Sequence, residues 1–339
     1  MQKHPFARRI SAILLSLTLV APVLAQKAHA GTLETIGVIG GLWAVLNERN
    51  VHYYKYASPA GPIEKKFTPM GSLKTDHKTF KAPKTTWKKY EVWYPKEDAA
   101  SGKTYPLVIF ANGTGTPVDK YGPVLKHLAS WGFVAAGNAD ENCRTGESSA
   151  ATLDFLLAQN ENPESPLYGK IDTEHIGISG HSQGGVGAMN AVTKQPNGNR
   201  YKAIFSISAT SSFWSKPGEV LGETWAYDPS QIRIPVFFAA GTGNWDAGTA
   251  SDKSATSGQG ISPLWSQIEN FNAVPEGVPT VRARETGKDH GDMLRAPDAY
   301  MTAWFSYWLK GDEEAGKAFF GENPEIQNNK NWQDVEIAE

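Results

Sequence analysis

A serine between two glycines is the side chain in this sequence best suited to covalent chemistry. Residues 180–184 read Gly-His-Ser-Gln-Gly, with Ser182 at the centre. Residues 175–179 before it predict a short buried strand, and the small residues at 184–192 predict a closely packed helix. A Gly-x-Ser-x-Gly pentad between strand and helix is typical of a sharp turn that lifts the serine hydroxyl above the sheet. Ser182 is therefore the candidate nucleophile.

A nucleophilic serine needs a base, and the histidines of this chain narrow the choice to one. The chain contains 8 histidines, and only His290 follows Ser182 in sequence. In the hydrolase order of nucleophile, acid and histidine, the base lies beyond the serine. His290 occupies a Gly-rich loop after a predicted strand at 279–285. We therefore expect His290 to be the general base.

The acid that orients the histidine should follow a strand of its own. Residues 232–240 are strongly apolar and lead into the segment that ends at Asp246. This position makes Asp246 the expected acid, able to orient His290 and to stabilise its charge. Asp252, further along the same loop, is the alternative. Asp289 is adjacent to the histidine, so its side chain is expected to point away.

Two backbone amides are predicted to form an oxyanion hole. Residues 105–112 read as a core strand that ends in a Gly-Thr-Gly turn at 113–115. This turn directs the amide of Thr114 toward the nucleophile, and the amide of Gln183, just after the serine, supplies the second donor. Two fixed N–H groups aimed at a developing alkoxide typically lower the barrier by several kcal/mol.

The first thirty residues have the pattern of a secretory signal peptide. A basic start precedes an apolar stretch at 11–25 and a small-x-small site at 28–30, so cleavage is expected before Gly31. A second apolar run at 36–46 is too short to span a bilayer. We expect a secreted or periplasmic protein with no stable membrane anchor.

Composition excludes several other classes of protein. The net charge is −2 with no basic stripe, so a nucleic-acid partner is not expected. Cys143 is the only cysteine, which excludes an internal disulfide and indicates a structural or incidental thiol. The expected chemistry requires no cofactor and no metal, and the expected partner is a small or polymeric ester.

Strands and helices alternate along most of the chain. The pattern predicts an α/β fold with a mainly parallel sheet and helices on both faces. Residues 89–94 alternate as an edge strand should. The short interval between 208 and 232 leaves little room for a large lid. The expected divisions are a signal peptide at 1–30, an N-terminal leader and extension at 31–86, a catalytic domain at 87–325 and a C-terminal tail at 326–339.

With these residues in place, the chain resembles the α/β-hydrolase superfamily. Within it, the chain is similar to bacterial cutinase-like polyester hydrolases and to the chlorophyllase and platelet-activating-factor acetylhydrolase group. The resemblance covers about residues 88–325 and implies the same nucleophile, acid, base and oxyanion amides. It also implies an aromatic subsite wall, here Phe213 or Trp214. The polyester hydrolases usually carry a C-terminal disulfide and a shorter interval between acid and histidine, whereas Asp246 and His290 are 44 positions apart.

These observations predict a serine ester hydrolase that works through an acyl-enzyme. One alternative is a peptidase or acyltransferase that uses the same residues. Another is a non-catalytic secreted protein that uses its 11 tryptophans to hold apolar ligands. Most of these tryptophans are expected in the core or at its edge. Trp214 and Trp245 are the two expected to contact a substrate.

Overall fold

The computed structural model describes residues 48–96, 102–215, 223–248 and 260–339. The chain divides into two units, residues 1–56 and residues 57–339. The described part of the first unit includes one short 3-10 helix, η1 (Tyr53–Lys55). The predicted signal peptide lies outside the described residues. The following description concerns the second unit.

A single sheet organises the second unit, and its described strands follow the order β1-β2-β4-β3-β5-β6-β7-β8-β9. Neighbouring strands from β4 to β8 run parallel, whereas β1, β2 and β9 pair antiparallel at the two sides. This confirms the mainly parallel sheet predicted from the alternation. The strands are β1 (Thr75–Ala82), β2 (Lys88–Pro95), β3 (Tyr105–Ala111), β4 (Val134–Asn138), β5 (Ile171–His181), β6 (Tyr201–Ile207), β7 (Val236–Gly241), β8 (Thr280–Glu285) and β9 (Trp332–Ala338).

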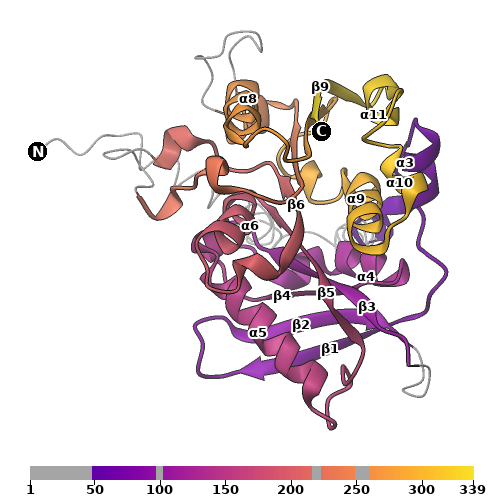
Figure 1. The fold of residues 1–339 in the computed structure, drawn as a ribbon, viewed down its shortest axis with the longest axis vertical. Coiled ribbons are helices and arrows are strands. Elements are labelled where there is room, and N and C mark those ends of the chain that lie inside the picture. Colours follow the sequence, from indigo (N-terminus) through magenta and orange to yellow (C-terminus); the bar gives the residue numbers. More distant parts are fainter. Residues whose placement is uncertain (1–47, 97–101, 216–222, 249–259) are drawn as a thin grey trace, which may run out of the picture. The chain divides into compact units, whose positions relative to one another are not determined.

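Helices cover both faces of the sheet, with α5 and α6 on one face and α4 and α9 on the other (Figure 1). The longer helices are α3 (Pro62–Phe67), α4 (Gly122–Ser130), α5 (Glu147–Glu161), α6 (Gln183–Thr193), α8 (Leu264–Ala273) and α9 (Asp298–Lys310). A buried ion pair joins α4 to α9, because His127 Nδ1 lies 2.8 Å from Asp298 Oδ2. The chain has the fold of an α/β-hydrolase.

The two-residue period of the strands assigns each side chain to a face. Ile109 of β3 belongs to one apolar cluster with Leu153 of α5 and Val186 of α6. The next residue, Phe110, points to the opposite face, where its ring lies 4.6 Å from that of Tyr121. Every residue of β3 is buried, as expected for a strand that helices cover on both sides.

The sheet is wider than the sequence predicted. Residues 89–94 were expected at an edge, but β1 pairs outside them. The predicted tail at 326–339 contains β9, which pairs with β8. β1 is mostly polar and exposed, so it lacks the apolar pattern that reveals a strand, whereas β9 mixes polar and apolar residues and is mostly half-buried. In the described part of the chain, no helix is long and apolar enough to cross a membrane.

Candidate active site

The turn between β5 and α6 carries Ser182 in a strained conformation. Its backbone angles are φ 62° and ψ −125°, a region that residues other than glycine rarely adopt. A Cβ on Gly180 would lie 2.1 Å from the carbonyl oxygen of Gly184, and a Cβ on Gly184 would lie 2.1 Å from that of Ala111. The two flanking glycines are therefore required by close backbone contacts. The amide of Ser182 donates to the carbonyl of Ile207, 2.9 Å away, which ties the turn to β6.

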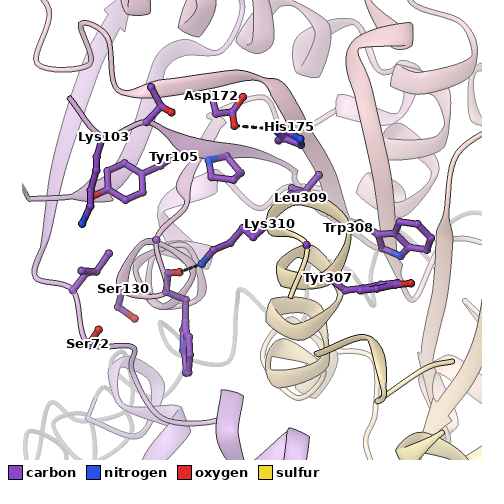
Figure 2. A pocket seen from close by; sticks show the side chains of 16 residues that line it. Ser72, Lys103, Tyr105, Ser130, Asp172, His175, Tyr307, Trp308, Leu309 and Lys310 are labelled. Carbon is purple, nitrogen blue, oxygen red and sulfur yellow. Dashed lines mark hydrogen bonds and ion pairs between the residues drawn. The ribbon is translucent and has the colours of Figure 1, made fainter. Parts of the chain in front are cut away.

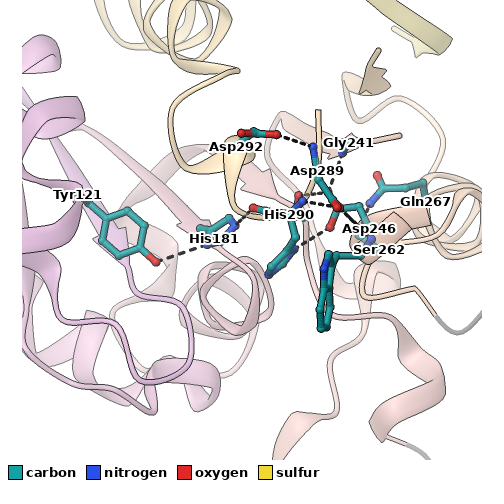
Figure 3. Close-up of polar contacts among 11 residues, drawn as sticks. Tyr121, His181, Gly241, Asp246, Ser262, Gln267, Asp289, His290 and Asp292 are labelled. Carbon is teal, nitrogen blue, oxygen red and sulfur yellow. Dashed lines mark hydrogen bonds and ion pairs between the residues drawn. The ribbon is translucent and has the colours of Figure 1, made fainter. Parts of the chain in front are cut away.

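Asp246 and His290 form a close pair at the same edge of the sheet. Asp246 lies on α7 (Asn244–Ala247), a short helix just after β7, and its side chain is fully buried. His290 Nδ1 lies 2.7 Å from Asp246 Oδ1 (Figure 3). Because Nδ1–H donates to the carboxylate, the neutral imidazole presents a lone pair at Nε2, as a general base requires.

Three donors hold the Asp246 carboxylate in its ionised form. Burial would raise the pKa of Asp246, but the charge of His290 and the hydrogen bonds to the carboxylate outweigh burial and hold the pKa below its usual value. Besides the imidazole, Oδ2 accepts from the Ser208 hydroxyl at 2.6 Å and from the Gly241 amide at 2.7 Å. The Asp246 carboxylate is therefore charged and fixed in orientation.

A buried histidine joins the base loop to the serine turn. His181, the residue before Ser182, has its Nε2 2.9 Å from the His290 carbonyl oxygen, and the two rings lie 4.6 Å apart. Burial and the nearby charge of His290 lower the pKa of His181 to about 3, so His181 is neutral. Its Nε2–H donates to the carbonyl, and its Nδ1 lies 3.4 Å from the Tyr121 hydroxyl. The loop of His290 is thereby fastened to the residue next to Ser182.

The Ser182 hydroxyl itself makes no hydrogen bond to any other described residue. Hydrogen bonds between nucleophile and base are often long in unliganded enzymes and shorten when substrate binds. The structure thus brings the three residues to one edge of the sheet, with Asp246 and His290 already paired.

Thr114 and Gln183 lie on two turns that share one anchor. The carbonyl oxygen of Glu141 accepts from the Gly115 amide at 3.2 Å and from the Gln183 side-chain amide at 2.5 Å. Gln183 begins α6, so its backbone N–H has no intrahelical acceptor. The Thr114 amide likewise has no acceptor among the residues described. Both N–H groups remain available to a ligand oxygen.

Comparison with known proteins gives two matches. Residues 63–216 match the PET hydrolase-like family, a stretch that includes Ser182 and both amide turns. The chain is thus similar to the PET hydrolase-like family over this stretch. It is also 29% identical over 111 residues to the bis(hydroxyethyl) terephthalate hydrolase of Streptomyces coelicolor (strain ATCC BAA-471 / A3(2) / M145), covering 31% of this chain and 34% of that protein. The alignment thus spans about a third of the length of this relative.

The three aromatic residues predicted to contact a substrate differ in their surroundings. Phe213 and Trp214 lie on η6 (Ser212–Ser215), with ring centroids 5.1 Å apart. Trp214 is buried and Phe213 is half-buried, whereas Trp245, next to the acid, is 47% exposed. Trp245 is therefore the most accessible of the three to a substrate. Asp252, the alternative acid, lies outside the described residues.

The sequence did not reveal Ser208 as a residue of the site, and it gave a wrong expectation for the direction of the Asp289 side chain. Ser208 directly follows β6, with a positive φ of 45°, and donates to the acid. Its position at the carboxyl end of a parallel strand was the available signal. Asp289 was expected to point away, but its Oδ1 accepts hydrogen bonds from the backbone of both the acid and the base. A loop that folds back on its neighbour makes this possible.

A separate pocket of about 870 Å³ lies at the amino ends of β3 and β5 (Figure 2). Its lining includes Lys103, His175 and Lys310, and the Lys310 ammonium donates to the Trp131 carbonyl at 2.7 Å. Ser182 instead follows the carboxyl end of β5, and no predicted site residue lines this pocket. In the described part of the chain, no group of His, Cys, Asp and Glu side chains could hold a metal ion.

Proposed function

We propose that this chain is a serine ester hydrolase that acts on carboxylic esters through an acyl-enzyme. The observation that carries the proposal is the 2.7 Å hydrogen bond between His290 and the buried Asp246, tied through His181 to the strained turn of Ser182. Serine is a weak nucleophile unless an adjacent base removes its proton, and a histidine oriented by a carboxylate is suited to that role.

In this mechanism, His290 Nε2 accepts the Ser182 proton as the hydroxyl oxygen attacks the ester carbonyl. The backbone amides of Thr114 and Gln183 then donate hydrogen bonds to the negatively charged oxygen of the tetrahedral intermediate. The imidazolium returns the proton to the leaving alcohol, and the acyl group stays on the serine. A water molecule, deprotonated by His290, releases the acid and restores the enzyme.

The proposed substrates are small esters, including aromatic ones. The support is the exposed indole of Trp245 beside the acid and the similarity to a protein named bis(hydroxyethyl) terephthalate hydrolase. Aromatic rings favour stacked or edge-on contacts with other aromatic rings, which an exposed tryptophan offers. We further propose that the protein is secreted through the signal peptide predicted at residues 1–30.

Labelling with a fluorophosphonate tests the proposal, because only an activated serine reacts. We expect modification of Ser182 in the wild type and hydrolysis of p-nitrophenyl esters and bis(hydroxyethyl) terephthalate. Ser182→Ala should abolish labelling and lower turnover on the order of 10³-fold or more. Ser230→Ala, outside the site, is the matched control and should behave as wild type. A Ser182→Ala protein that keeps a tenth of the activity would show that another residue is the nucleophile.

A further inference from the structure

One carboxylate oxygen contacts both the loop of the acid and the loop of the base. Asp289 Oδ1 accepts hydrogen bonds from the backbone N–H groups of Trp245 at 2.9 Å, Asp246 at 3.1 Å and His290 at 2.8 Å. Figure 3 shows Asp289 beside the acid–base pair. We propose that Asp289 is a positioning residue that holds these two loops in the register that the Asp246–His290 bond requires. Its effect on catalysis rests on the proposed function.

The helix that carries the acid lacks a cap of its own. Its N-cap residue is Gly243, which has no side chain to accept from the first amides of α7. Such amides have no intrahelical acceptor and are normally satisfied by a polar side chain at the N-cap. Here the acceptor comes from Asp289, in the loop after β8. The acid-bearing helix is thus capped by the residue adjacent to the base.

The glycine at the N-cap is what allows this close approach. A Cβ on Gly243 would lie 2.5 Å from the Cβ of Asp289. The amide of Gly243 also donates to the carbonyl of Lys288 at 2.7 Å, which makes a second link between the same loops. Gly243 therefore has two effects: it provides no capping side chain, and it leaves room for the Asp289 side chain that caps the helix instead.

Asp289 is itself held in place from its own side. Its amide donates to Asp292 Oδ2 at 3.0 Å, and its carbonyl accepts from the amides of Asp292 at 2.8 Å and Met293 at 3.1 Å. The carboxylate is therefore a fixed point rather than a free surface charge. Because its Oδ1 bonds the amides of both acid and base, a shift of either loop breaks one of these bonds.

Steady-state kinetics on p-nitrophenyl acetate test the proposal. Asp289→Ala should lower kcat about 10- to 100-fold with KM changed less than about 2-fold, because a displacement near 1 Å can cost about 10² in rate. Asp289→Asn should stay within about 3-fold of wild type, because its amide oxygen can accept the same bonds. Gly243→Ala, which pushes Asp289 away while keeping its charge, should reproduce the loss.

Asp312→Ala is the matched control. Asp312 caps α10 (Glu313–Gly316), another four-residue helix, by accepting from the Ala315 amide at 3.1 Å. Its loss should shift the melting temperature by an amount comparable to that of Asp289→Ala while leaving kcat unchanged. Equal losses of kcat in the Ala and Asn variants of Asp289 would assign the effect to charge and overturn the positioning role.

A second readout needs no substrate. The His290 Nδ1–H proton in its bond to Asp246 should give a far-downfield proton NMR signal, assigned by its loss in His290→Ala. This signal should disappear or move upfield in Asp289→Ala and Gly243→Ala, and persist in Asp289→Asn and Asp312→Ala. An unchanged signal in both disrupting variants overturns the proposal. If the wild type hydrolyses no ester, the proposed function fails, and the NMR comparison still decides the role of Asp289.

Discussion

Glu285 is a buried acid at the end of β8, and it should make the stability of the protein depend on pH. Its side chain is 6% exposed, and its Oε2 has no hydrogen-bond partner among the residues that the structure describes. Burial raises the pKa of Glu285 from its ordinary 4.5 to about 8; Lys288 opposes the rise, whereas the negative charges of Glu64 and Asp292 add to it. Glu285 is therefore mainly protonated in the folded protein at neutral pH.

The sign and size of the effect follow from proton linkage. Between pH 4.5 and 8 the folded state holds a proton on Glu285 that the unfolded state has lost. The contribution of this proton to the stability of the folded state is thus fully present below pH 4.5 and is lost as the pH rises through 8. Each pKa unit corresponds to about 1.4 kcal/mol, so raising the pH from 5 to 7 should cost wild type about 2.5 kcal/mol relative to a variant that cannot ionise here.

Glu285→Gln provides that variant, with nearly the same shape. Urea unfolding curves at several pH values between 5 and 7 give the free energy of unfolding of both proteins. As the pH rises from 5 to 7, the free energy of unfolding of the variant should increase by about 2.5 kcal/mol relative to that of the wild type. Glu276→Gln, on an exposed turn, controls for the change in net charge. If the difference in free energy of unfolding between Glu285→Gln and wild type does not vary with pH, the reasoning is refuted.

Two further predictions concern the acid. Asp246→Asn should lower kcat by roughly 10²- to 10⁴-fold on a small ester, because the amide stabilises the wrong tautomer of His290 and carries no charge; Asp252→Asn should have little effect, and the reverse pattern would move the acid to position 252. Ser208→Ala removes one of the three hydrogen bonds to the carboxylate, and a bond to a charged group is worth about 1.5–3 kcal/mol. We expect about a 10-fold loss of kcat, with Ser208→Thr closer to wild type; equal kcat in all three proteins would contradict a role for this hydroxyl.

The central strands could be predicted from the sequence because burial leaves a strong pattern. The segments that became β3 and β7 are continuous apolar runs, which helices on both faces require. The outer strand β1 could not be predicted this way. Its sequence, Thr-Asp-His-Lys-Thr-Phe-Lys-Ala, is mostly polar and exposed, and its pairing with β2 depends on backbone hydrogen bonds that any side chain permits.

The start of α5 shows a different limit. Serine is a preferred N-cap residue, and Ser148 and Ser149 lie near the start of the helix, but the helix begins at Glu147 after Gly146, whose φ is +81°. Both serines are buried inside the helix instead. A Cβ on Gly146 would lie 2.4 Å from the amide nitrogen of Ala191, so the packing of this turn against α6 requires a glycine. Tertiary contact, which local sequence does not record, decided the boundary.

For the candidate site, the order of residues in the sequence indicated which side chains to choose as candidates, but it did not indicate the contacts that hold them in place. His290 could be proposed from its position alone, because no other histidine follows Ser182. The contact of His181 with the His290 carbonyl could not be foreseen, because it joins loops that are distant in sequence and meet only in the folded sheet. For Ser208, position at the end of a strand indicated a place near the site but not its hydrogen bond to Asp246.

Asp246 and His290 lie far apart in sequence, and the order of strands in the sheet brings them together. In sequence they lie 44 positions apart, which departs from the family that the chain resembles. In the sheet, however, β7 and β8 are parallel neighbours with Gly241 paired to Glu285, so the loops after both strands leave the same edge side by side. Inserted residues between the strands can therefore lengthen the connection without separating the acid from the base. The hydrogen bonds from both loops to Asp289 add a direct link between the loops that does not depend on the length of the connection.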